Sequence, residues 1–192
     1  MKRIFFFDFD GTVTNKDSFL LFTFYTVGIK KLFKYWLKTT LKIIFTSIDK
    51  GKLKEQFFID NFKNIGEKEF QNICNNFEKK YFSSIIKNSF LQYLNSLRDE
   101  DEVVIVTASV KNYLKPWCDR LKLKLISTEL EVIKGKLTGN FSTPNCNYAE
   151  KVKRIKMIYN LDDFDSIYVF GDTNGDKQMM SISTNQFYKF FK

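Results

Sequence analysis

Three short apolar runs stand out from the rest of the chain. They cover residues 4–7, 103–106 and 167–170, and each is followed directly by polar residues. Uninterrupted apolar runs of this length are typical of strands that are buried on both faces of a parallel sheet. In an open α/β sheet, ligands bind outside the carboxyl ends of the strands. The pattern therefore predicts an α/β fold in which three separate segments deliver polar groups to one edge of the sheet.

The segment between the first two runs is longer than a simple crossover requires, which is roughly a dozen residues. Apolar residues recur there at helical spacing in two sets: Phe57, Phe58, Phe62 and Ile65, and then Phe82, Ile85, Ile86, Phe90 and Leu94. We therefore predict a helical cap that is inserted after the first strand and covers the edge. The predicted division is a core of residues 1–14 and 98–192 and a cap of residues 15–97.

Two further elements are expected in the second half of the chain. Residues 130–133 and 136–138 flank a glycine-containing turn and predict a β-hairpin. Residues 148–159 predict a helix, with Asn147 and Glu150 in the spacing of a capping box.

Composition narrows the chemistry that the chain can use. Its 192 residues include 31 lysines and arginines against 22 aspartates and glutamates, for a net charge of +9, and no histidine. The lack of histidine excludes Ser-His-Asp and Cys-His nucleophiles and most zinc sites. Cys74, Cys118 and Cys146 are too scattered for a disulfide framework, so we expect a reduced, cytoplasmic setting. The aromatic C-terminal residues 186–192 fit either a last strand or a docking tail.

Carboxylates follow two of the three apolar runs. Asp8 and Asp10 come after the first run, and Asp172 and Asp176 come after the third. Carboxylates in close contact raise one another's pKa unless a cation lies between them, and Mg²⁺ prefers oxygen ligands. Taken alone, each pair also fits a turn with solvated aspartates.

Two other polar residues hold candidate positions at the same edge. Lys151 falls in the first turn of its predicted helix, where a cation opposes the helix macrodipole unless an anion binds nearby. Its neighbours Lys153 and Arg154 fit a solvated basic face equally well. Thr107 follows the second run and fits either a strand-end hydroxyl or a ligand-binding group.

In this order, the motifs resemble those of the haloacid dehalogenase-like (HAD) phosphatase superfamily. Residues 8–12 are similar to its first motif, residues 106–109 to its second, Lys151 to its third and residues 171–176 to its fourth. The resemblance covers nearly the whole chain. It implies a Rossmann-like parallel-sheet core with a helical cap inserted after the first strand.

Three other segments resemble one subfamily, in which the helical cap follows the first motif. They are residues 137–139, 145–147 and 150–152, and the subfamily includes phosphoserine phosphatases and phosphatidylglycerophosphatase C-like enzymes. A dehalogenase is disfavoured, because Asp10 supplies the acid/base group that a phosphatase needs.

The resemblance implies a role for each motif residue. Asp8 would attack phosphorus and form an aspartyl-phosphate, and Asp10 would act as general acid and then as general base. Thr107 and Lys151 would hold the phosphoryl oxygens.

A magnesium ion is implied as well. It would bind the Asp8 carboxylate, the Asp10 backbone carbonyl and Asp172, while Asp176 would orient either the water molecules of the metal or Lys151. The other residues expected to bind substrate are Gly11, Thr12, Asp17, Ala108 and Ser109.

Phosphoserine is the less favoured of the expected substrates. Asp17 lies where phosphoserine phosphatases carry a substrate-binding acid, but there is no arginine between Arg3 and Arg98 to recognise a carboxylate. A small phosphorylated metabolite or a lipid phosphate, similar to phosphatidylglycerophosphate, is expected instead.

Most of the positive charge lies in residues 16–54, which hold nine lysines against Asp17 and Asp49. Four of these lysines recur at every fourth residue beside large apolar side chains: Lys30, Lys34, Lys38 and Lys42. One interpretation is a cap helix whose apolar face packs inward and whose lysines are solvated. The other is a basic amphipathic helix over residues 30–45 that lies on an anionic bilayer, which would place a cytoplasmic protein at the inner membrane face.

The basic, aromatic-rich segment also fits a protein of another class. It would suit a HAD scaffold without catalytic activity that binds nucleic acid or membrane. Every acidic residue of the motifs is intact, however, which favours an enzyme. We therefore expect a Mg²⁺-dependent phosphomonoester hydrolase that binds no nucleic acid.

Overall fold

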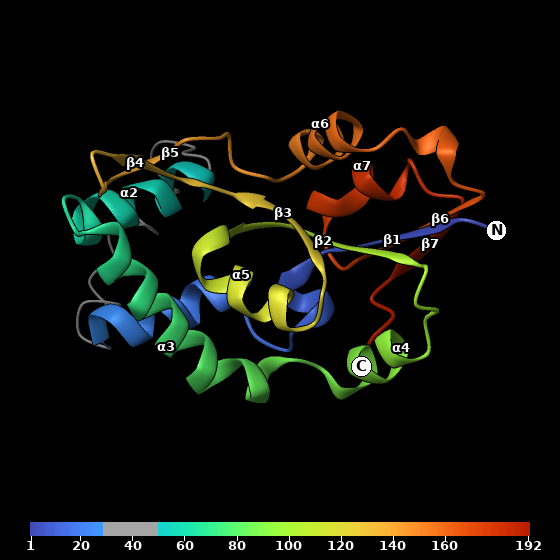
Figure 1. Ribbon diagram of the computed structural model, residues 1–192, viewed down its shortest axis with the longest axis horizontal. Coiled ribbons are helices and arrows are strands. Elements are labelled where there is room, and N and C mark those ends of the chain that lie inside the picture. Colours follow the sequence, from blue (N-terminus) through green and yellow to red (C-terminus); the bar gives the residue numbers. More distant parts are fainter. Residues whose placement is uncertain (29–49) are drawn as a thin grey trace.

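The computed structural model describes residues 1–28 and 50–192. A parallel five-stranded sheet forms its centre, with the strand order β3-β2-β1-β6-β7 (Figure 1). The strands are β1 (Arg3–Phe7), β2 (Glu102–Val110), β3 (Lys124–Thr128), β6 (Ser166–Gly171) and β7 (Asn185–Tyr188). The predicted α/β class and the three predicted strands are confirmed. The basic helix expected over residues 30–45 lies outside the described residues.

The alternation of side chains along β1 divides the core between the two faces of the sheet. Phe5 and Phe7 join a hydrophobic cluster with α4 (Asn88–Asn95) and α5 (Lys111–Arg120). Ile4 and Phe6 join a second cluster on the other face with α6 (Ala149–Ile158) and α7 (Lys177–Met180). In Figure 1, α6 and α7 lie above the sheet and α4 lies below it. Both faces are therefore covered, which explains the uninterrupted apolar runs.

The insertion after β1 begins and ends at an isolated antiparallel bridge between Thr14 and Ile86, and the chain rejoins the sheet at β2. Between these residues, the structure describes a helix over residues 18–28, α2 (Lys50–Phe62) and α3 (Glu67–Ile85), which we call the inserted helices. The next helix, α4, packs on the sheet, where the Phe90 ring meets the Phe7 ring edge-on at 5.3 Å. The division of the chain at residues 15 and 97 stays a prediction.

The predicted hairpin is confirmed as β4 (Leu130–Ile133) and β5 (Lys136–Phe141). It lies beside α2 (Figure 1), and the Asn64 amide just after that helix donates to the Leu137 carbonyl at 2.8 Å. Gly139, at a φ of +87°, lies so close to the α2 backbone that a Cβ would come within 2.5 Å of the Ile59 Cα. The inserted helices are therefore fixed to a hairpin that comes from the second half of the chain.

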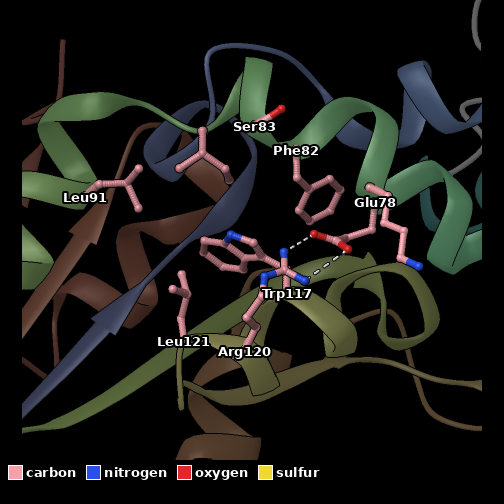
Figure 2. Close-up of a pocket in the computed structure, with 9 residues that line it drawn as sticks. Glu78, Phe82, Ser83, Leu91, Trp117, Arg120 and Leu121 are labelled. Carbon is pink, nitrogen blue, oxygen red and sulfur yellow. Dashed lines mark hydrogen bonds and ion pairs between the residues drawn. The ribbon is translucent and has the colours of Figure 1, made fainter.

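Aromatic side chains join the inserted helices to the core. The Phe22 ring stacks on Tyr113 of α5 with the ring centroids 5.1 Å apart. Figure 2 shows the pocket between α3 and α5, where Phe82 lies beside Trp117 with the ring centroids 6.1 Å apart. At the edge of this pocket, the Arg120 guanidinium donates to the buried Glu78 carboxylate. One continuous hydrophobic cluster thus runs from the sheet into the inserted helices.

The C-terminal segment forms a last strand, and its final residues pack on the core. Residues 185–188 form the edge strand β7, and the chain then turns back so that Phe191 packs among Phe7, Phe90 and Phe170. Short helical turns complete the chain: η1 (Phe9–Val13), η2 (Leu161–Asp163) and η3 (Asn174–Asp176). Within residues 1–28 and 50–192, no helix is long and apolar enough to cross a membrane.

Candidate active site

The first two aspartates lie on a tight turn at the carboxyl end of β1. The Asp8 amide donates to the Phe170 carbonyl at 2.9 Å, which holds the start of the turn against β6. Gly11 has a φ of +87°, and its Cα lies against the Asp172 carboxylate, so that there is no room for a Cβ. The turn after β1 and the loop after β6 therefore meet at one edge of the sheet, as the sequence predicts.

Lys151 joins two carboxylates that come from different ends of the chain. Its Nζ lies 2.5 Å from Oδ1 of Asp8 and 2.7 Å from Oδ1 of Asp176. All three residues are buried, and the Lys151 side chain is 1% exposed. A buried cation needs paired anions, and each of these anions in turn needs the cation. The lysine is thus a structural link between α6 and the strands β1 and β6 as well as a positive charge at the site.

A capping box holds Asp176 in place. The Thr173 hydroxyl accepts from the Gly175 amide, and Oδ2 of Asp176 accepts from the Thr173 amide at 3.0 Å. The predicted capping box of Asn147 and Glu150 is wrong. The N-cap of α6 is Tyr148, which makes no capping bond with its side chain.

The charge cluster shifts the pKa values of its members in different directions. Burial raises the pKa of Asp8 to about 7, although Lys151 opposes that rise. Burial also raises the pKa of Asp172. The Thr12 hydroxyl donates a hydrogen bond to its Oδ1 at 3.2 Å, which opposes that rise. Burial works in the same direction at Asp176, but there Lys151 and Thr173 outweigh it and lower the pKa. Burial lowers the pKa of Lys151, and Asp8 and Asp176 outweigh it, so that the pKa lies above its usual range.

The donor set suits a hard divalent cation. One carboxylate oxygen each from Asp8, Asp172 and Asp176 lies within 4.8 Å of the others. Oxygen ligands in a partly desolvated, acidic cluster are what Mg²⁺ prefers. Both oxygens of Asp176 accept hydrogen bonds at 2.7 to 3.0 Å. In the described structure, the Asp172 carboxylate accepts at Oδ1 alone, from the Thr12 hydroxyl, and Oδ2 of Asp8 accepts from the same hydroxyl at the long distance of 3.5 Å. Asp176 is therefore placed to hold Lys151, and Asp8 and Asp172 have more freedom to bind a metal.

Asp10 is held by groups from both the inserted helices and the core. Its Oδ1 accepts from the Ser18 amide at 2.6 Å, and its Oδ2 accepts from the Ser109 hydroxyl at 2.6 Å. Burial raises the pKa of Asp10, as does the neighbouring Asp17, which favours the protonated form that a general acid needs. Ser109 is buried and supports Asp10, and its predicted contact with substrate stays a prediction.

The second motif supplies a hydroxyl at the end of β2. Thr107 is buried, and its Oγ1 accepts from the Ser109 amide at 3.1 Å, which leaves its O–H free to donate. Thr107 and Ala108 both line the pocket that contains Asp8. By contrast, Gly11 and Thr12 pack around Asp172, and their predicted contact with substrate is not tested by this arrangement.

The candidate active-site pocket has a volume of about 380 Å³ and lies between the inserted helices and the core. Of the predicted residues, it is lined by Asp8, Asp10, Asp17, Thr107, Ala108, Lys151 and Asp176. Asp17 also accepts a hydrogen bond from the Leu20 amide at 2.8 Å, as a helix N-cap does.

Sequence reasoning missed several residues of this pocket: Lys54, Asn147, Tyr148, Thr173, Asn174 and Gly175. Lys54 belongs to α2, and only the packing of the inserted helices brings it to the site. Thr173, Asn174 and Gly175 lie inside the fourth motif, so their position could have been inferred from that motif. Asn147 and Tyr148 directly precede the helix of Lys151. The sequence indicates Asn147 only as a helix cap and as part of the subfamily segment 145–147, and no sequence signal points to Tyr148.

A model of the haloacid dehalogenase-like hydrolase family matches residues 5–181. The chain belongs to this family. The match confirms the resemblance carried by the four motifs, and the structure places those motifs together around Asp8, Lys151 and Asp176.

Individual proteins resemble the chain in sequence or in fold. Protein CicA of Caulobacter vibrioides is 30% identical over 191 residues, which cover 97% of this chain and 85% of CicA. A protein of unknown function from Bordetella pertussis Tohama I has a similar structure, with a TM-score of 0.84, 18% identity, and coverage of 97% of this chain and 89% of that one. A substrate-bound phosphoserine phosphatase shares the fold at a TM-score of 0.68 and 14% identity, with coverage of 98% and 86%.

Proposed function

We propose that this HAD-family hydrolase cleaves phosphomonoesters in a Mg²⁺-dependent reaction that passes through an aspartyl-phosphate on Asp8. The observation that carries the proposal is the contact of Asp8 with Lys151, which is itself anchored to Asp176. A carboxylate that is buried at the bottom of a polar pocket, with a cation beside it, is suited to attack a phosphoryl group whose oxygens need positive charge.

The chemistry follows from the positions of two carboxylates. An Asp8 oxygen forms a bond to phosphorus as the bond between phosphorus and the leaving oxygen breaks, and Asp10 gives its proton to that oxygen. A water molecule then attacks phosphorus, Asp10 takes the proton of that water, and the bond between phosphorus and Asp8 breaks. Inorganic phosphate leaves, and both aspartates return to their starting states.

Two groups of the pocket would hold the phosphoryl oxygens during these steps. Lys151 and the Thr107 hydroxyl would donate hydrogen bonds to them. Asp8 and Asp172 would bind Mg²⁺, with Asp176 behind Lys151. When bound, Mg²⁺ supplies positive charge that stabilises the charge developing on the phosphoryl group.

The proposal is tested by hydrolysis of p-nitrophenyl phosphate with Mg²⁺ and with EDTA. We expect turnover with Mg²⁺, its loss with EDTA, and a decrease of at least about 10³-fold in Asp8→Asn, because the nucleophile is removed. Asp162→Asn changes an exposed aspartate far along the chain and serves as the control. An inert wild-type protein, or full activity in Asp8→Asn, would contradict the proposal.

The substrate is proposed to be a small phosphorylated metabolite or a lipid phosphate. A phosphoserine-like substrate is the second candidate, because one acidic and one basic side chain from the inserted segment, Asp17 and Lys54, line the pocket. Such a pair would complement an ammonium and a carboxylate. Comparing kcat/KM for phosphoserine, glycerol 3-phosphate and phosphatidylglycerophosphate separates the three classes. In the phosphoserine case, Lys54→Met would raise KM for phosphoserine and leave that for glycerol 3-phosphate unchanged.

The lipid alternative also predicts a role for the basic segment. Residues 16–54 carry nine lysines and two aspartates, so the lipid alternative requires this segment to bring the protein to anionic vesicles through salt-sensitive attraction. Sedimentation with vesicles of phosphatidylglycerol at low and high salt, with Lys34→Glu/Lys38→Glu as the variant, tests it. Absence of binding at every salt concentration would remove membrane contact and leave the small metabolite.

A further inference from the structure

Tyr148 has a backbone conformation that a tyrosine rarely adopts. Its φ is +50° and its ψ is −127°, close to the first central position of a type II′ turn, where glycine is strongly preferred. The Glu150 amide donates to the Asn147 carbonyl at 3.0 Å, which is the bond that closes such a turn. A side chain with a Cβ is therefore strained at this position, three residues before Lys151.

The neighbouring residues hold Tyr148 in this conformation. The Tyr148 amide donates to Oδ1 of Asn147 at 2.9 Å. The Asn147 side chain fits against Gly175, where an added Cβ would lie 2.5 Å from Oδ1. The turn before α6 is thus packed against the loop after β6 that carries Asp176. None of these contacts involves the phenol ring, and Tyr148 as a residue is 53% exposed.

Tyr148 belongs to the candidate active-site pocket. Tyr148 lines the pocket together with Asp8, Lys54 and Lys151, and it is the only aromatic residue among the described residues that do so. The other lining residues are charged, polar or small. Strained residues at a site persist when the surrounding structure fixes them, and their cost calls for a functional explanation.

We propose that Tyr148 determines specificity by packing its ring against an apolar or planar face of the leaving group. This inference rests on the proposed phosphomonoesterase function and narrows its substrates to esters that present such a face. The charged groups around Asp8 recognise the phosphoryl group, which all phosphomonoesters share. Asp17 and Lys54 would bind charged groups of a leaving group, whereas Tyr148 provides the one aromatic surface in the described part of the pocket and would select for an apolar or planar face.

Two substrates and three variants test the proposal. Phenyl phosphate has a planar leaving group and glycerol 2-phosphate has a polar, non-planar one. Tyr148→Gly removes the ring and the strain, Tyr148→Ala removes only the ring, and Tyr148→Phe keeps the ring. Because the ratio of kcat/KM between the substrates is compared among variants, the intrinsic reactivity of each ester cancels.

We expect the ratio for phenyl phosphate over glycerol 2-phosphate to fall about 3- to 10-fold in the Gly and Ala variants, through KM, and to be kept in the Phe variant. We also expect Tyr148→Gly to raise the Tm by about 2–8 °C relative to Tyr148→Ala. If the ratio of kcat/KM between the two esters is unchanged in both the Gly and the Ala variant, the inference about Tyr148 is wrong and the proposed function still stands. Wild-type protein that hydrolyses neither ester overturns the proposed function and, with it, the inference.

Discussion

The Nζ of Lys87 donates a hydrogen bond to the carbonyl oxygen of Gly11 at 2.7 Å. Lys87 is the N-cap residue of α4, just after the inserted helices end, and Gly11 lies in the turn that carries Asp8 and Asp10. The same ammonium donates to the Phe191 carbonyl at 3.1 Å. One lysine therefore connects the end of the insertion, the turn of Asp8 and Asp10, and the C-terminal segment.

Lys87→Met should weaken this connection. Hydrogen bonds from a charged donor contribute about 1.5–3 kcal/mol, and the two acceptors would lose theirs together. We expect the Tm to fall by about 3–8 °C and the activity to fall as the turn loosens, as measured by thermal unfolding and by phosphatase assay. Lys68→Met changes an exposed lysine of α3 and should leave both quantities unchanged. If Lys87→Met and Lys68→Met have the same Tm and the same activity, the hydrogen bonds of Lys87 contribute to neither quantity.

Gly11→Ala separates backbone strain from steric contact when it is compared with Gly135→Ala. Both glycines have a positive φ, of +87° and +74°, but an added Cβ meets the Asp172 carboxylate at Gly11 and nothing within 4 Å at Gly135. Gly135→Ala should cost about 1 kcal/mol of unfolding free energy. Gly11→Ala should cost more and abolish activity, because Asp172 must move. Urea unfolding of both variants measures the loss of unfolding free energy. An equal loss in the two variants would mean that the Asp172 side chain moves away from the added Cβ at no cost.

Lys151→Met should make stability depend on metal. Removal of the ammonium leaves Asp8 and Asp176 buried without their cation, at a cost of about 3–5 kcal/mol in the absence of metal. Added MgCl₂ should then raise the Tm of the variant by more than it raises that of wild type, because a divalent cation compensates the same carboxylates. Lys153→Met, at a lysine whose side chain is 65% exposed, is the matched control. If MgCl₂ shifts neither Tm, the acidic cluster does not bind Mg²⁺.

Asp101 should make the stability of the fold depend on pH, independently of the active site. Its fully buried carboxylate accepts from Nε of Arg3 at 2.8 Å and from the Arg98 amide at 2.9 Å. Burial alone would raise its pKa, but the bonds from Arg3 and Arg98 outweigh burial and hold the pKa below its usual value. A carboxyl whose pKa is lower in the folded state stabilises the protein above its unfolded pKa of about 3.9, and this contribution is lost as the pH falls through the folded pKa.

Asp101→Asn should therefore lower the Tm at pH 7 and have a progressively smaller effect below about pH 4. Thermal unfolding of wild type and variant between pH 7 and pH 3 measures the difference. Asp99→Asn, two residues away and exposed, is the control. If the difference in Tm between wild type and Asp101→Asn stays constant down to pH 3, ionised Asp101 does not stabilise the fold.

The sheet could be predicted because its physical requirement is visible in the chain. A central parallel strand is buried on both faces, so residues 4–7 have to be apolar without interruption. The active-site edge followed from the same argument, since polar residues after each strand meet there. Lys151 was identified as a candidate because a lysine in the first turn of a helix is unfavourable unless an anion lies nearby.

Other parts of the site depend on contacts that the local sequence does not encode. Lys54 reaches the pocket only because α2 packs between the helix of residues 18–28 and the β4–β5 hairpin. The spacing for a capping box occurs at Asn147 and Glu150 and again at Thr173 and Asp176, but only the second pair forms one. The difference is the turn at Tyr148, whose positive φ depends on its packing against the loop of Gly175.

The aromatic cluster that continues from the sheet into the inserted helices limits how substrate can enter. If these helices swung away as a rigid lid, the contacts of Phe22 with Tyr113 and of Phe82 with Trp117 would break, and large rings would face water. Such an opening is expensive compared with small movements of side chains at the pocket mouth. Entry and product release should therefore proceed through a permanently formed opening, with side-chain rearrangement as the gate.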